Sequence, residues 1–66
     1  MKNRLIVLRA ERKISQQKLS EVSGINRVTI SEIETEKRDP DIKTVVKLVK
    51  ALNVPASEIF FDLGVV

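Results

Sequence analysis

The sequence of 66 residues is long enough for one small domain, and it contains neither cysteine nor histidine. Those absences exclude disulfides and the usual structural metal sites and remove most catalytic options, so we expect no metal, no cofactor and no enzymatic activity. Twelve Lys and Arg residues against nine Asp and Glu residues give a formal net charge of +3, which favours a polyanionic partner.

A domain of this size buries only about 60% of the surface that its unfolded chain exposes, so its stability is marginal without further support. With disulfides and metals excluded, a partner chain is the remaining source of that support. The longest early apolar run, residues 5–8, is too short for a membrane span or for the core of a signal peptide. We therefore expect a cytoplasmic protein with no membrane association and no small-molecule ligand.

Apolar residues recur at helical spacing along most of the chain, which predicts a single all-α domain. The first helix is predicted over about residues 2–13, with Leu5 and Leu8 on one face. The second helix follows Ser15, whose side chain is a good N-cap. It ends at Gly24, which supplies the left-handed conformation common at helix C-termini.

The third helix is predicted to follow the capping residue Asn26 and to run to about Thr35. A charged stretch, residues 36–40, ends in proline and predicts a loop. Asp41 caps a fourth helix, and Pro55 suits the first turn of a short fifth one. The predicted inward-facing positions are Leu19, Val22, Ile30, Ile33, Val45, Leu48, Val49 and Leu52.

Residues 15–34 combine two short helices with a tight glycine-containing turn, which is the helix-turn-helix arrangement. Such a pair exposes the outer face of its second helix, and the major groove of DNA admits one helix of that kind. On this face, Arg27 can donate two hydrogen bonds to guanine and Val28 can pack on a thymine methyl group. Glu32 can accept a hydrogen bond from cytosine N4, or it can be a bystander.

Other polar side chains are placed to contact the DNA backbone. Gln16 and Gln17 open the first helix of the pair, where free N–H groups and the positive end of the helix dipole favour a phosphate. Lys37 and Arg38 follow the second helix and can reach the backbone on the other side. A plainer interpretation stands beside this one, because polar first turns and charged loops occur on most solvated surfaces.

The chain resembles the Xre/Cro group of phage-repressor-like helix-turn-helix domains. The resemblance rests on Arg9, ISQQKLS (14–20), SGINRVTISEIE (23–34), Pro40-Asp41, VVKLVKALNVP (45–55) and EIF (58–60). It implies an all-α, five-helix, lambda-repressor-like fold over residues 1–66. It also implies that Gln16 binds a phosphate. Arg27, Val28 and Glu32 match the base-reading positions of the family.

The same resemblance places Asn26 and Thr29 near the DNA backbone, although capping by itself accounts for Asn26. It further implies an ion pair between Arg9 and Glu34, which would orient the first helix against the third. Glu36 stands where the family often has glycine, which predicts a different bend in the loop.

Ile6 and Val7 stand where the family usually exposes polar residues, and residues 61–66 form an apolar tail. Together they present more apolar surface than a monomer comfortably exposes. We therefore predict a homodimer. Its predicted interface contains Ile6, Val7, Phe61, Leu63 and Val65.

These features predict a sequence-specific regulator of transcription that binds double-stranded DNA as a homodimer on a pseudo-palindromic operator, with residues 26–35 in the major groove. The alternative is a helix-turn-helix module for protein interaction, such as an antitoxin or a bridging cofactor. Val28 and Glu32 on the outer face favour that alternative, whereas Arg27 and Gln16 favour DNA. RNA binding has less support, because the chain lacks stacking aromatic residues.

Overall fold

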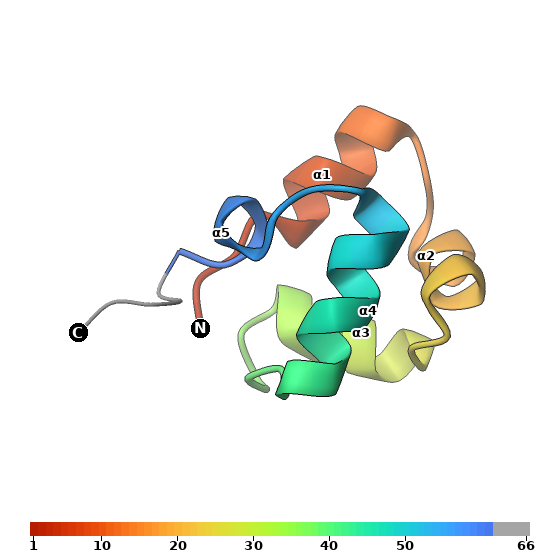
Figure 1. The fold of residues 1–66 in the computed structure, drawn as a ribbon. Helices are drawn as coiled ribbons and strands as arrows, with labels where there is room; N and C mark the ends of the chain where they lie inside the picture. Colours follow the sequence, from red (N-terminus) through yellow and green to blue (C-terminus); the bar gives the residue numbers. More distant parts are fainter. Residues whose placement is uncertain (62–66) are drawn as a thin grey trace.

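The computed structural model describes residues 1–61 and contains five helices in that part of the chain (Figure 1). They are α1 (Leu5–Arg12), α2 (Gln16–Ser23), α3 (Arg27–Glu34), α4 (Ile42–Leu52) and α5 (Ala56–Ile59). Helix α4 packs against both α2 and α5, and α2 packs against α3. The predicted all-α, five-helix fold is confirmed. No helix within residues 1–61 has the length and apolar character needed to cross a bilayer.

Short polar side chains begin three of these helices, as predicted. Ser15 Oγ accepts a hydrogen bond from the backbone N–H three residues later at 2.9 Å, and Asp41 Oδ1 accepts the equivalent bond at 2.8 Å. Asn26 Oδ1 accepts from the N–H two residues later at 2.8 Å. Side-chain and backbone hydrogen bonds with Thr44 lower the pKa of Asp41, because they stabilise its charged form. Gly24 ends α2 with φ +76°, the predicted left-handed conformation.

The start of the first helix was predicted wrongly. Helix α1 begins at Leu5 rather than near residue 2, because residues 2–4 pair with residues 59–61 instead of joining the helix. Asn3 and Phe60 form an antiparallel bridge, and backbone hydrogen bonds of 2.8 and 3.2 Å flank it. The two ends of the described chain are thereby held together.

The side chain of Asn3 explains why the backbone is extended at this point. Its Oδ1 accepts from the Leu5 N–H at 3.0 Å, and its Nδ2 donates to the Ile33 carbonyl at 2.9 Å. The side-chain amide of Asn3 therefore bonds a free backbone N–H in the first turn of α1 and a backbone carbonyl in the last turn of α3. A helix that started two residues earlier would not place the amide between those two groups.

The core lies where α1, α2, α3, α4 and α5 meet, and α4 passes in front of α3 in the view of Figure 1. Of the predicted inward-facing positions, Leu19, Ile30, Ile33, Leu48 and Leu52 are buried, and Val45 and Val49 are partly buried against the core. Val22 was predicted wrongly, because α2 buries only Leu19 and leaves Val22 51% exposed. The buried apolar residues in the described chain are Leu5, Leu8, Leu19, Ile25, Ile30, Ile33, Leu48, Leu52, Ile59 and Phe60. Because this core draws on every helix, it fixes the angle between α2 and α3.

The loop after α3 turns at Glu36, which has a left-handed backbone with φ +63°. A residue with a Cβ atom adopts that conformation at a cost of roughly 1–2 kcal/mol, and glycine adopts it freely. The backbone N–H of Glu36 donates to the Ile33 carbonyl at 3.1 Å, so the loop folds back onto the end of α3. Glutamate thus occupies a turn that glycine would form at lower cost.

Candidate nucleic-acid interface

The turn between α2 and α3 is held by side chains of α2. Ser20 Oγ donates a hydrogen bond to the carbonyl of Ile25, and Ser23 Oγ accepts one from the Ile25 N–H at 3.1 Å. Ile25 is buried, and its side chain enters the core. The two serine hydrogen bonds satisfy its backbone N–H and carbonyl groups, which burial removes from water. These contacts set the position of α3 relative to α2.

The outer face of α3 is open to solvent. Ile30 and Ile33 are buried. Because an α-helix has 3.6 residues per turn, Val28 and Glu32 lie on the opposite side of α3. The side chain of Val28 is 56% exposed, a large fraction for a valine with a core close by. Arg27 is exposed at the first turn of the same helix. The residues predicted to read bases thus lie together on one accessible helix.

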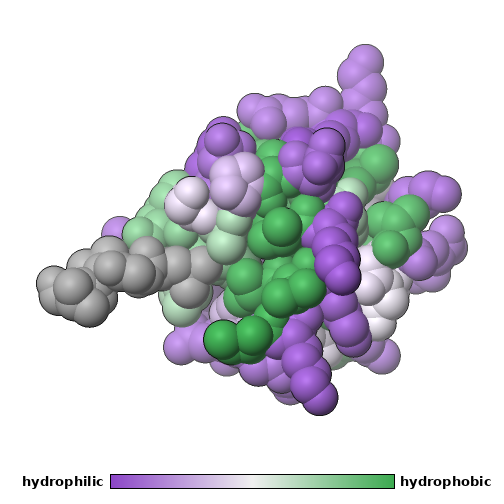
Figure 2. All heavy atoms as spheres, in the orientation of Figure 1, coloured by the Kyte–Doolittle hydropathy of each residue, from purple (hydrophilic) through white to green (hydrophobic). Residues whose placement is uncertain are grey.

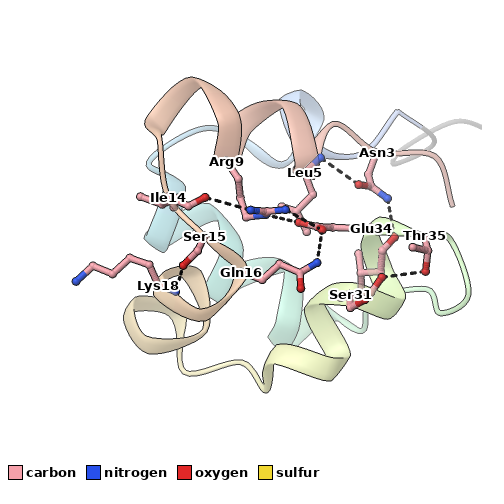
Figure 3. Close-up of polar contacts among 11 residues, drawn as sticks. Asn3, Leu5, Arg9, Ile14, Ser15, Gln16, Lys18, Ser31, Glu34 and Thr35 are labelled. Carbon is pink, nitrogen blue, oxygen red and sulfur yellow. Dashed lines mark hydrogen bonds and ion pairs between the residues drawn. The ribbon is translucent and has the colours of Figure 1, made fainter.

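Behind α3 lies a buried carboxylate, that of Glu34, whose side chain is only 2% exposed. Arg9 of α1 donates to it twice, from Nε to Oε2 and from Nη2 to Oε1 at 3.2 Å, so the two residues form an ion pair. Arg9 Nη1 also donates to the Ile14 carbonyl at 3.1 Å. Figure 3 shows Arg9 and Gln16 reaching Glu34 from two different helices.

Gln16, predicted to bind a phosphate, takes part in this network. Its Nε2 donates to Glu34 Oε1 at 2.7 Å. An amide nitrogen carries two hydrogens, so the second remains for another acceptor. Gln17, predicted at the same surface, is exposed, and its Nε2 donates to Glu21 Oε2 at 3.3 Å along the same helix.

Two further residues predicted to lie near the DNA backbone occupy different environments. Asn26 is exposed and caps α3, which agrees with the plainer interpretation of its role. Thr29 is partly buried on the flank of the helix.

The loop after α3 carries the two cations predicted to contact DNA, and one of them forms an ion pair within the protein. Lys37 and Arg38 are both exposed. Arg38 Nε lies 3.1 Å from Glu32 Oε1, so two residues that were predicted to contact DNA separately form an ion pair. Sequence reasoning missed this contact because it depends on the left-handed turn between them, which no helical or strand spacing indicates.

The predicted dimer residues are exposed where the structure describes them: Ile6, Val7 and Phe61 are each about half exposed. Leu63 and Val65 lie outside the described residues. A second apolar site was not predicted. Ile42 is 80% exposed, and Val46 follows it one turn later on α4. Figure 2 shows hydrophobic side chains gathered over α4 on the face that the view presents.

Comparison with known proteins agrees with this geometry. A family model described as Helix-turn-helix matches residues 5–59. An uncharacterized HTH-type transcriptional regulator of Methanocaldococcus jannaschii is 38% identical over 60 residues, which are 91% of each chain. The HTH-type transcriptional regulator PuuR of Escherichia coli is 39% identical over 59 residues, 89% of this chain but only 32% of that protein. Among solved structures, the restriction-modification controller protein C.AhdI from Aeromonas hydrophila superposes with a TM-score of 0.81 and 32% identity, over 86% of each chain.

Proposed function

The chain belongs to the Xre-like helix-turn-helix family of transcriptional regulators, and from that premise we propose that it acts as a homodimer on a pseudo-palindromic operator in double-stranded DNA. The observation that carries the proposal is the open outer face of α3, with Arg27 and Val28 exposed opposite the buried Ile30 and Ile33. A helix of this kind fits the major groove, which is ~12 Å wide. The proposal includes no catalysis, since the chain has neither histidine nor cysteine.

In the proposed complex, α3 lies in the major groove and its flanks contact the backbone. Arg27 donates to guanine O6 and N7, and Val28 packs on a thymine methyl group. The free N–H of the Gln16 amide binds a phosphate on one side, while Lys37 binds one on the other. A lysine that neutralises a phosphate releases counterions from the DNA, so affinity falls as the salt concentration rises. Each phosphate neutralised in this way steepens the slope of log K against log salt concentration by about 0.9.

Selection of binding sites from random duplex DNA tests this proposal. The wild-type protein is expected to enrich a two-fold-symmetric motif with half-sites ~34 Å apart, one helical turn. Arg27→Ala is expected to lose the preference for guanine at one position of each half-site, a loss of about 1–3 kcal/mol in discrimination. Lys50→Ala, which removes an exposed cation from the last turn of α4, is the matched control and should keep the motif. Absence of any enriched motif would contradict the proposal and favour a protein partner.

The exposed face of α4 supports the homodimer. Ile42 and Val46 lie one helical turn apart on its surface, and the partly buried Val45 and Val49 complete an apolar face on the same helix. Patches of that kind on small domains usually mark an interaction site. A second copy is the proposed occupant, because a 66-residue domain gains from a partner chain the stability that its own core lacks. We place the contact on this face and include Phe61 in it, and the contact predicted through Ile6 and Val7 is the alternative.

Charge placed on this face is expected to separate the subunits. Ile42→Glu combined with Val46→Glu should convert the dimer to a monomer in sedimentation experiments at micromolar concentration, with the helical circular dichroism unchanged because both side chains are exposed. Ile6→Glu is the comparison, since Ile6 is an exposed isoleucine on a different helix. Dissociation by Ile6→Glu alone would move the interface to α1. A monomeric wild-type protein would contradict the homodimer.

A further inference from the structure

The ion pair between Glu32 and Arg38 lies in the middle of the surface proposed to face DNA. Glu32 projects from the outer face of α3, and Arg38 reaches it from the following loop, with 3.1 Å between Nε and Oε1. Their side chains are 36% and 55% exposed, so the pair is accessible to a ligand. Each member alone has an obvious partner on DNA, a cytosine amino group for the carboxylate and a phosphate for the guanidinium.

The loop keeps Arg38 close to α3 whether or not the pair is formed. The backbone N–H of Lys37 donates to the Glu32 carbonyl at 2.8 Å, and the N–H of Glu36 donates to the Ile33 carbonyl at 3.1 Å. Two backbone hydrogen bonds thus tie the loop to the last turn of α3. Rotation of side chains is therefore enough to open or close the pair, and the backbone need not move.

We propose that the Glu32–Arg38 pair determines operator specificity by exchanging partners only on DNA that has a cytosine opposite Glu32. This inference rests on the proposed function, because it assumes that α3 enters the major groove. Guanine and thymine offer Glu32 no amino group, and the N6 amino group of adenine lies beside the N7 acceptor, which repels a carboxylate. An unpaired carboxylate near phosphates is unfavourable, so on these bases Glu32 keeps Arg38. Where cytosine N4 donates to Glu32, Arg38 is released and binds a phosphate.

Because of this exchange, one base pair controls two contacts between the protein and DNA. A correct cytosine supplies a hydrogen bond to Glu32 and also a backbone contact through Arg38. A wrong base supplies neither, because the closed pair withholds the cation from the phosphate. Arg38 thereby contributes to discrimination although it contacts no base.

The test measures Kd against salt for the selected operator, for the operator with that cytosine replaced, and for non-specific duplex. Glu32→Gln is close in shape and leaves Arg38 without its counter-ion. It is expected to bind non-specific DNA about 3- to 10-fold more tightly, with a logarithmic salt slope steeper by about 0.9, one additional phosphate contact. Its preference for the cytosine operator should fall at least about fivefold, the lower end of the discrimination given by one good side-chain contact to a base.

Arg38→Gln gives the complementary result. Its salt slope on the operator should become shallower by about 0.9, while its slope on non-specific DNA should match that of the wild type, because there the pair is closed. Glu36→Gln is the matched control: it removes one exposed carboxylate from the same loop and should leave the slope on non-specific DNA at the wild-type value.

Two outcomes would overturn the proposal. One is a Glu32→Gln protein whose salt slopes equal those of Glu36→Gln, which would show that loss of Glu32 has no effect beyond that of removing any carboxylate from this region. The other is a lower non-specific slope in Arg38→Gln, which would show that Arg38 already contacts phosphate on any sequence. A wild-type protein that binds no duplex would instead refute the proposed function itself.

Discussion

Replacing Arg9 with alanine is expected to lower the free energy of unfolding by about 3–5 kcal/mol, because it leaves a buried carboxylate without its counter-ion. The Glu34 side chain is 2% exposed, and Arg9 supplies two of the hydrogen bonds to its oxygens. A domain of this length has a total stability of only about 3–10 kcal/mol at the usual value per residue. Much of the Arg9→Ala protein should therefore be unfolded at 37 °C.

Urea denaturation followed by circular dichroism measures this loss, at one fixed protein concentration because dimerisation adds stability by mass action. Arg4→Ala is the matched control. Arg4 Nη2 lies 3.8 Å from Glu11 Oε2 on the solvated side of α1, and such surface pairs contribute at most about 1 kcal/mol. If Arg9→Ala lost no more than Arg4→Ala, the buried pair would have no special role.

The double variant Arg9→Ala with Glu34→Leu separates two effects on stability: the cost of a buried carboxylate without a counter-ion, and the loss of the other contacts of the arginine. Apolar replacement of both members of a buried ion pair is often close to neutral. The double variant should therefore be more stable than Arg9→Ala alone. It should bind DNA less well than the wild type, since Gln16 loses the acceptor that holds its amide.

Phe60→Ala is expected to cost about 3–5 kcal/mol, the usual loss for a buried phenylalanine. The ring is 1% exposed, and the backbone of the same residue forms the bridge to Asn3. Its removal opens a cavity beside the pairing of residues 2–4 with residues 59–61, so the start of α1 should loosen together with the core.

The neighbouring phenylalanine provides the control for this prediction. Phe61 is about half exposed, so Phe61→Ala should change the unfolding free energy by less than about 1 kcal/mol when measured at low protein concentration. Hydrogen exchange of the α1 amides reports the local effect, and faster exchange is expected in Phe60→Ala than in Phe61→Ala. Equal stability of the two variants would contradict the assignment of Phe60 to the core.

By itself, the sequence determined the features that depend on residues close together along the chain. The caps at Ser15, Asn26 and Asp41 each act on a backbone N–H two or three residues away, and the left-handed end at Gly24 is equally local. The burial of Ile30 and Ile33 followed from the helical period. These features were enough to predict the helix-turn-helix and to place Arg27 and Val28 on its open face.

Only the tertiary structure decided which distant groups meet. It placed the Asn3 amide on the carbonyl of Ile33, 30 residues away, and so shortened the first helix. It turned Gln16 inward to a carboxylate 18 residues away and used a left-handed Glu36 to bring Arg38 to Glu32. The physical reason is that such contacts depend on how loops close and how helices cross. Periodicity and capping report on single elements, and the angles between elements emerge only when the shared core is packed.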